Sequence, residues 1–282
     1  MTYKPCKVIA EGCANHQGDL KLAKEMTQMA NVCGADYIKW QKRNPIESVP
    51  PEWHKKAHPQ PEFSYGSTYL EHREALEFSV DQHAELLKFA KMVGIGCAIS
   101  VWDITSCKQM LELDYDFLKI PSAANLNFDL MNFLVHNYKK DIHLSLGMIT
   151  KSERNKIVDY VSRYPHRFII YHTTTEYPCP FSRAFLLQIP ELLQKVPRVG
   201  FSSHAKGIAI ENAAVALGAS WIEKHYTNDR TIRSGDAANS LEPEGLRKLV
   251  RDLKATYQAL QYKPDDMTEV EKEQSDKLRV KV

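Results

Sequence analysis

Two short apolar runs late in the chain each end in a histidine, His204 in the first and His225 in the second. If both runs are strands, their period-2 alternation puts Ser202 on the same face as His204. The same rule puts Glu223 beside His225. Strands that are buried on both faces of a parallel sheet are otherwise almost entirely apolar. Two imidazoles from neighbouring strands, with oxygen groups beside them, predict a site for a divalent metal with open coordination positions.

Other strand-like runs also bring polar side chains to their carboxyl ends. These side chains are Glu11, Lys39, Gln41, Ser100, Lys119, Ser122, Ser145, Thr173, Thr175 and Tyr177. Lysines among hydroxyl groups favour an anionic ligand, either a phosphate or a carboxylate. Burying so many charged groups without a function would cost several kcal/mol for each unpaired group, which disfavours a purely structural reading of the set. An anion site beside a metal fits a phosphorylated, carboxylated compound that meets a polarised carbonyl.

The elements that must position these side chains alternate between strands and helices. Helices are expected at Leu20–Cys33, Asp81–Val93, Asn212–Leu217 and Pro243–Leu260, and a glycine follows each of the first three. Strands are expected at Lys7–Cys13, Tyr37–Gln41, Gly96–Val101, Phe117–Pro121, His143–Gly147, Phe168–Thr174, Arg198–His204 and Trp221–Thr227. Eight such units predict an α/β fold, a closed (β/α)8 TIM barrel. An open, doubly wound sheet is the alternative, but no Gly-x-Gly-x-x-Gly turn follows the first strand.

A segment rich in proline and aromatic residues interrupts the alternation between about residues 43 and 79. Long connections of this kind are usually functional or partly disordered, so we expect an excursion over the barrel mouth that serves as a lid or a dimer contact. We expect the catalytic barrel to occupy residues 1–262 and a charged, solvated tail to occupy residues 263–282. Lys224 faces away from His225 by alternation, and we expect it to contact the surrounding helices.

The composition bears on partners and compartment. The 282 residues carry 37 basic and 35 acidic side chains, a net charge of +2, which gives no case for a nucleic acid or a membrane surface. No run approaches the ~18 apolar residues of a membrane span. The amino terminus lacks the apolar core of a signal peptide. Six scattered cysteines without a Cys-x-x-Cys pair indicate reduced thiols in a cytoplasmic protein.

Several segments together resemble a known family. They are Ile9–Gly18, Gly34–Gln41, Phe117–Ser122, Tyr171–Pro178, Gly200–His204, Ile222–Thr227, Asp229–Arg230 and Ser240–Pro243. In order and spacing, from about residue 7 to 260, the chain resembles the sialic acid synthase family, the phosphoenolpyruvate-condensing nonulosonate synthases. The resemblance implies a barrel that joins phosphoenolpyruvate to an open-chain aldose, such as an N-acylated hexosamine. The products would be a 3-deoxy-2-keto sugar acid and phosphate, released by C–O cleavage.

The resemblance also implies a role for each matching residue. His204 and His225 match the metal ligands, usually for Mn²⁺, and Glu11 matches the carboxylate that does acid–base work. The family positions that contact phosphoenolpyruvate are matched by Lys39, Ser100, Lys119, Ser122, Ser145 and Ser202. The sugar and metal pocket matches Gln41, Thr175, Tyr177 and Asp236, and Glu223 joins the substrate-binding set in support of the histidines. A homodimer is the assembly that the family suggests.

The departures from the family pattern lie on the acceptor side. Ser122-Ala-Ala124 stands where the family commonly has Ser-Gly-Glu, Ser203 stands for an aspartate, and Ser234-Gly-Asp-Ala237 replaces Gly-Pro-Asp-His. The chain also stops at Val282, where a small C-terminal domain would begin in most members. We therefore predict an acceptor other than plain N-acetylmannosamine, or a cap that a separate polypeptide supplies.

Two other functions compete with this reading. A class I aldolase would form a Schiff base on Lys39 or Lys119. A non-catalytic barrel would bind a sugar or phosphoenolpyruvate without releasing phosphate, which the missing glutamate favours.

Overall fold

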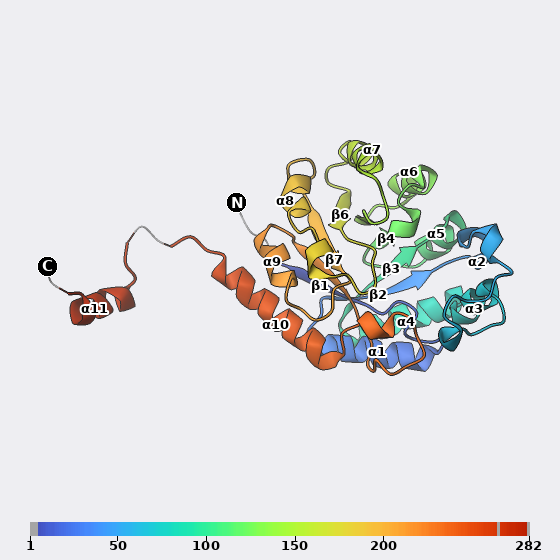
Figure 1. Ribbon diagram of the computed structural model, residues 1–282, viewed down its shortest axis with the longest axis horizontal. Helices are drawn as coiled ribbons and strands as arrows, with labels where there is room; N and C mark the ends of the chain where they lie inside the picture. Colours follow the sequence, from blue (N-terminus) through green and yellow to red (C-terminus); the bar gives the residue numbers. More distant parts are fainter. Residues whose placement is uncertain (1–4, 264–265, 281–282) are drawn as a thin grey trace.

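Eight parallel strands form a closed barrel in chain order, with β8 paired back to β1 (Figure 1). This computed structural model describes residues 5–263 and 266–280. The strands are β1 Lys7–Glu11, β2 Tyr37–Lys42, β3 Gly96–Val101, β4 Leu118–Ile120, β5 Ile142–Ser145, β6 Phe168–His172, β7 Val199–Ser203 and β8 Trp221–His225. The predicted TIM barrel is confirmed. Several strands are shorter than predicted because their last residues leave the ladder to form the loops of the site.

Helices cover the outside of the barrel (Figure 1). They are α1 Leu20–Val32, α4 Val80–Val93, α5 Ile104–Leu111, α6 Phe128–Asn137, α7 Lys151–Val161, α8 Gln188–Leu193, α9 Glu211–Ala216 and α10 Pro243–Ala259. Each predicted helix is present with small shifts at its ends. Local chemistry fixes these ends: Asp19 caps α1, and Gly94 ends α4 in the left-handed conformation with φ +86°.

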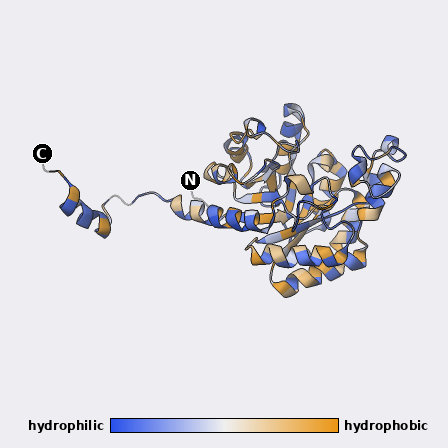
Figure 2. Ribbon diagram, turned by 60° about the horizontal axis from the view of Figure 1, so that its bottom comes forward, coloured by the Kyte–Doolittle hydropathy of each residue, from blue (hydrophilic) through white to orange (hydrophobic). Residues whose placement is uncertain are grey.

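The helices and strands pack through apolar faces. Helix α10 buries Leu246, Leu249, Val250 and Leu253 at helical spacing, and its solvent side is hydrophilic (Figure 2). Lys224 points outward from β8, as expected, and is fully buried in an ion pair with Glu211 of α9, Nζ to Oε1 2.9 Å. No helix among the described residues is long and apolar enough to cross a membrane.

The barrel interior holds an aromatic and aliphatic layer beneath the polar residues. Phe117 and His143 stack face to face, with ring centroids 3.6 Å apart. Tyr171 closes the layer with a 2.8 Å hydrogen bond between its hydroxyl and Nδ1 of His143. Phe117 and His143 each lie two positions before a polar residue, Lys119 and Ser145. The packed layer therefore forms a floor for those side chains and leaves the carboxyl end of the barrel open.

The excursion between β2 and α4 folds into short helices at the barrel mouth (Figure 1). These are α2 Pro45–Ser48, the 3-10 turns Pro51–Trp53 and Pro61–Phe63, and α3 Tyr69–Leu76. Its backbone is tied to the loop after β8, because Tyr65 donates its hydroxyl to the carbonyl of Arg233 at 2.8 Å. Whether it acts as a lid or a dimer contact stays a prediction.

Residues near the carboxyl end lie away from the barrel. Helix α11, Glu269–Leu278, stands apart from the other elements (Figure 1). It contains no buried residue, so it adds nothing to the core.

Candidate active site

A cavity of about 440 Å³ opens at the carboxyl ends of the strands. All fourteen predicted site residues line it: Glu11, Lys39, Gln41, Ser100, Lys119, Ser122, Ser145, Thr175, Tyr177, Ser202, His204, Glu223, His225 and Asp236. Parallel strands bring their carboxyl ends to one rim, so residues that are far apart in the sequence meet here. The structure therefore brings these side chains together in one cavity, while their roles stay predictions.

Buried charges form the deepest layer of this cavity. Lys119 donates to Glu223, Nζ to Oε1 2.7 Å, and Lys39 lies 3.7 Å from the other oxygen of Glu223. Lys39 also forms an ion pair with Glu11 and donates to Ser100 Oγ at 2.8 Å. All four charged side chains are almost fully buried. The layer is therefore neutral as it stands, and an arriving anion would compete with the carboxylates for the lysines.

The pKa values of this layer follow from burial and mutual attraction. Burial would raise the pKa of Glu223, but the charges of Lys119 and Lys39 outweigh it and lower that pKa to about 2. Burial opposes the charge on Lys39, yet Glu11 and Glu223 raise its pKa. For Lys119, burial prevails and lowers the pKa. The two lysines are thus not equivalent, and Lys119 is the one whose charge is less well compensated.

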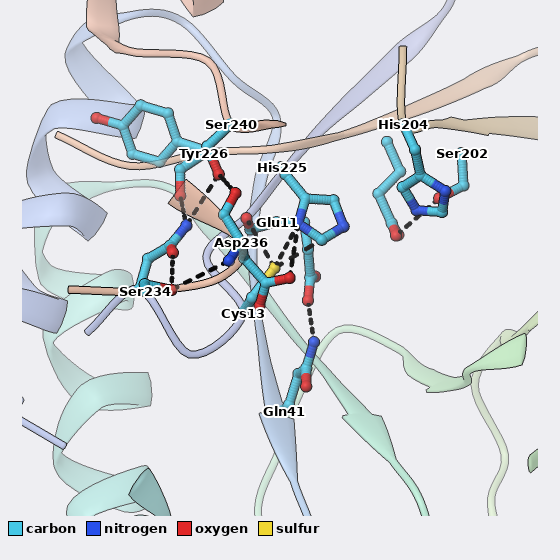
Figure 3. Close-up of polar contacts among 12 residues, drawn as sticks. Glu11, Cys13, Gln41, Ser202, His204, His225, Tyr226, Ser234, Asp236 and Ser240 are labelled. Carbon is cyan, nitrogen blue, oxygen red and sulfur yellow. Dashed lines mark hydrogen bonds and ion pairs between the residues drawn. The ribbon is translucent and has the colours of Figure 1, made fainter. Parts of the chain in front are cut away.

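Glu11 is held in a fixed orientation at the end of β1. One of its oxygens accepts from Gln41 Nε2 at 2.8 Å, and the other faces Lys39 (Figure 3). Arg43 in turn donates to Gln41 Oε1 at 2.5 Å, which sets the orientation of the amide. A carboxylate so positioned can receive a proton at the cavity wall.

Hydroxyl groups line the opposite wall. Ser202 donates to Glu223 Oε1 at 3.2 Å, and Ser122 accepts the backbone N–H of Gly147 at 3.2 Å. The hydroxyls of Thr173 and Thr175 are buried without a hydrogen-bond partner among the described residues. Buried polar groups are normally paired, so these two oxygens indicate that a ligand completes the wall.

The two histidines differ in their surroundings. His204 Nδ1 lies 2.7 Å from the carbonyl of Thr174, which leaves Nε2 for a ligand. Burial, with a contribution from His225, lowers the pKa of His204 to about 3 and keeps the ring neutral. His225 Nδ1 lies 2.9 Å from Cys13 Sγ and 3.9 Å from Asp236 Oδ1. The rings of the two histidines meet edge to face, with centroids 5.2 Å apart.

The donor atoms suited to a metal gather around His225. Among the described residues, Cys13, His225 and Asp236 form a set whose ligand atoms all lie within 4.8 Å of one another. His204 is not a member of that set, although the sequence pairs it with His225. Sulfur, imidazole nitrogen and carboxylate oxygen are all ligands of divalent transition metals, so the residues present fit such an ion.

Sequence reasoning missed four basic or aromatic residues of the wall, Arg43, Tyr69, Arg73 and Trp102. The Arg43 guanidinium stacks on Trp102, 3.5 Å from the ring centroid. Arg73 donates to the hydroxyl of Tyr69 at 2.8 Å. Burial and the charge of Arg73 lower the pKa of Arg43 to about 10. The basic residue directly after β2 was a usable signal, whereas α3 lies in an irregular segment whose path the sequence does not reveal.

Ala123 and Ala124, which stand where the family commonly has Gly-Glu, differ in where they point. Ala123 lines the cavity, whereas Ala124 packs in the hydrophobic core and is only 8% exposed. In this chain, therefore, the second alanine belongs to the core, and Ala123 is the one of the two that reaches the cavity wall.

A larger cavity of about 750 Å³ opens next to this one, between α7 and α8. It shares Met148, Thr173 and Thr175 with the polar cavity, but none of the lysines or paired histidines. The chemistry therefore belongs to the smaller cavity.

Comparison with known proteins agrees with this geometry. Residues 26–264 match the NeuB family. Human N-acetylneuraminate-9-phosphate synthase is 37% identical over 263 residues, which are 91% of this chain and 71% of the human protein. The chain belongs to the NeuB family. As a NeuB-family protein whose relatives are named as synthases, it is an enzyme of the sugar acid synthase class.

Other relatives of this NeuB-family chain cover similar parts of it. N,N'-diacetyllegionaminic acid synthase of Campylobacter jejuni is 32% identical and covers 91% of this chain and 78% of its own length. The solved N-acetylneuraminic acid synthetase from Leptospira borgpetersenii, in complex with citrate, has a TM-score of 0.81 and 29% identity, over 99% of this chain and 94% of that one. A truncated 3-deoxy-D-arabino-heptulosonate 7-phosphate synthase from Thermotoga maritima, 16% identical with a TM-score of 0.67, shares the fold over 90% of this chain and 87% of that one.

Proposed function

We infer that the chain condenses phosphoenolpyruvate with an open-chain aldose to give a 3-deoxy-2-keto sugar acid and phosphate. The observation that carries this proposal is the meeting of two buried lysines, a fixed carboxylate and a metal-type donor set in one cavity. The reaction needs a subsite for a trianionic enol ester, an acid–base group and an electrophile-activating site, and the cavity offers one of each. The family membership supports the same conclusion.

Lys39 and Lys119 would bind the phosphate and carboxylate of phosphoenolpyruvate. Both lysines face the cavity from β2 and β4, the strands on either side of β3. Lys119 pairs in register with Ser100 of β3, and Lys39 donates to the hydroxyl of Ser100 at 2.8 Å. Thr173 and Thr175 supply hydroxyls that find no hydrogen-bond partner within the described part of the chain. Together with Ser122, Ser145 and Ser202, they give the anion several neutral donors.

Glu11 would handle the proton of the added water. The C3 carbon of phosphoenolpyruvate bonds to the aldehyde carbon, and a water oxygen bonds to C2 as its proton passes to Glu11. Glu11 passes this proton to the oxygen of the former aldehyde, which becomes a hydroxyl. The C2–O bond to phosphate then breaks, phosphate leaves with the bridging oxygen, and the proton of the new C2 hydroxyl passes to the phosphate as the keto group forms. Gln41 contacts one oxygen of Glu11 and Lys39 contacts the other, so the carboxylate keeps its place through the reaction.

A divalent cation, expected from the family to be Mn²⁺, would be held by His225, with His204, Cys13 and Asp236 as the other donors at hand. When bound, such an ion supplies a Lewis acid for the aldehyde oxygen. Tyr177 packs on His204, ring centroids 4.2 Å apart, and limits the movement of that ring.

The acceptor would carry an anionic group of its own. Neither Arg43 nor Arg73 forms an ion pair with a carboxylate within the described part of the chain, yet both line the cavity. Two partly buried guanidiniums that are not engaged in a close ion pair among the described residues favour a phosphorylated or carboxylated aldose. The human relative is named for a phosphorylated product, which supports the same acceptor class.

A phosphate-release assay tests the proposal. The purified chain is incubated with phosphoenolpyruvate, Mn²⁺ and a panel of neutral and 6-phosphorylated N-acylhexosamines. We expect phosphate release with a phosphorylated acceptor, and a product whose mass equals the two substrates plus water minus phosphoric acid. Binding of phosphoenolpyruvate without release from any acceptor would instead favour a non-catalytic barrel. Lysine labelling by borohydride with a keto acid would favour the aldolase.

Some finer expectations rest on the sequence and the family resemblance alone. A homodimer, a cytoplasmic location and a separate capping polypeptide are predictions that sedimentation, fractionation and pull-down experiments can address.

A further inference from the structure

Cys13 occupies an unusual position directly after β1. Its thiol is 1% exposed and lies 2.9 Å from His225 Nδ1 (Figure 3). Its backbone has φ +48°, a left-handed conformation that costs a non-glycine residue on the order of 1 kcal/mol. Gly12 makes the turn possible, because a Cβ atom there would lie 2.3 Å from the Trp40 ring. The turn brings the thiol back toward the carboxyl end of β8.

Asp236 reaches the same point from the loop after β8. Its Oδ1 lies 3.9 Å from His225 Nδ1, and its side chain remains partly exposed to the cavity. Ser234 accepts the backbone N–H of Asp236 at 3.3 Å, and Ser240 donates to its carbonyl at 2.8 Å. These contacts hold the aspartate loop against the histidine.

Asn15 joins the two loops. Its Nδ2 donates to the carbonyl of Tyr226 at 2.9 Å and to Ser240 Oγ at 3.0 Å, while its Oδ1 accepts from Ser234 at 2.7 Å. Asn15 is fully buried and all of these groups are paired. The cysteine loop and the aspartate loop are thus tied to each other through a satisfied network, which is how supporting residues usually fix metal ligands.

We propose that Cys13, His225 and Asp236 bind one divalent cation through a thiolate, an imidazole and a carboxylate. This extends the proposed function by adding a sulfur ligand to a site that the sequence assigned to two histidines. A thiolate favours Zn²⁺, Co²⁺ or Fe²⁺, whereas a site of oxygen ligands and imidazoles would suit Mn²⁺. The ion that this chain prefers is therefore a borderline-soft metal, and Mn²⁺ binds more weakly.

The geometry needs only a small adjustment to accept such an ion. Ligands at about 2.3 Å for sulfur and 2.0–2.1 Å for nitrogen around a tetrahedral Zn²⁺ stand ~3.6 Å apart. The thiol and the imidazole are now 2.9 Å apart, so they would separate while Asp236 approaches. Burial raises the pKa of the free thiol, and a bound cation would supply the opposite charge that stabilises a thiolate in this place.

Optical titration with Co²⁺ tests the sulfur ligand without reference to turnover. The chain, freed of metal with a chelator, should develop a thiolate-to-cobalt charge-transfer band in the near ultraviolet at one equivalent. Cys13→Ser should abolish the band and weaken Zn²⁺ binding by at least ~10-fold, with a smaller effect on Mn²⁺. Cys6→Ser, a partly exposed thiol at the start of β1, is the matched control and should keep the band. A full band in Cys13→Ser would overturn the proposal.

X-ray absorption of the zinc-loaded wild-type chain asks the same question without a substitution. One sulfur scatterer at about 2.3 Å is expected, together with nitrogen and oxygen at 2.0–2.2 Å. A fit with nitrogen and oxygen alone would overturn the proposal, even if Cys13→Ser failed to fold. Phosphate release is measured on the same samples. A sulfur shell with no turnover would contradict the proposed function only, and turnover without a sulfur shell would contradict only the metal proposal.

Discussion

At the scale of single residues, two buried lysines on opposite faces of the barrel sheet, Lys119 and Lys224, have different tasks. Lys119 points inward to Glu223, Nζ to Oε1 2.7 Å, and Lys224 points outward to Glu211 at 2.9 Å. Both pairs are inaccessible to solvent. Removing one partner of a buried pair leaves the other charge uncompensated, which costs about 3–5 kcal/mol. Substituting each lysine in turn therefore distinguishes an effect on protein stability from an effect on ligand binding.

Lys119→Met and Lys224→Met should both lower the free energy of unfolding by a similar amount, measured by urea titration. Only Lys119→Met should also weaken phosphoenolpyruvate binding, by roughly 10- to 100-fold in calorimetry, because a charged hydrogen bond is lost. Equal weakening in Lys224→Met would contradict the assignment of Lys119 to the ligand.

His83 of α4 should make the free energy of unfolding sensitive to acid. Burial lowers its pKa to about 3, against about 6.5 in an unfolded chain. Between these values the unfolded state binds a proton that the folded state does not, so stability falls as the pH drops from 6.5 towards 3. The slope is up to ~1.4 kcal/mol per pH unit for this residue. Urea unfolding of His83→Gln should show a shallower slope in that window, whereas His136→Gln, on the exposed face of α6, should not. An unchanged slope in His83→Gln would refute this origin.

At the scale of elements, alternation along strands predicted the site and irregular segments hid part of it. Inward and outward faces follow from period 2, so the sequence predicts that Lys39 and Lys119 face inward. Cys13 lies beyond the strand end in a left-handed turn, where period 2 no longer applies. Ala124 turns into the core for the same reason, because it belongs to a 3-10 turn, Ser122–Ala124, and not to β4.

Helix α3 places Arg73 at the cavity wall, where we propose that it binds the anionic group of the acceptor. Arg73→Met should raise the KM for a phosphorylated aldose by roughly 10-fold or more, since a charged hydrogen bond is lost, and should leave the KM for phosphoenolpyruvate unchanged. Arg163→Met, an exposed arginine after α7, is the control. Steady-state kinetics with both substrates varied would show the effect. A change in the phosphoenolpyruvate KM of equal size would move Arg73 to the other subsite.

At the scale of the whole molecule, the barrel explains why distant sequence segments act together. Closure of β8 on β1 pairs Glu11 with His225 across the seam, so the proposed base and the metal-type ligands share one wall. Helix α11 takes no part in this arrangement. Removing residues 263–282 should leave the thermal unfolding midpoint and phosphoenolpyruvate affinity unchanged. A large fall in either would show that the tail contacts the barrel.

The most direct test of the central claim is the fate of the bridging oxygen of phosphoenolpyruvate. The full chain is given phosphoenolpyruvate labelled with ¹⁸O at the C2–O–P oxygen, a divalent metal and the aldose that best supports phosphate release. Condensation by C–O cleavage predicts that the label appears in the inorganic phosphate and that the sugar acid is unlabelled. Label retained in the sugar acid would contradict the account.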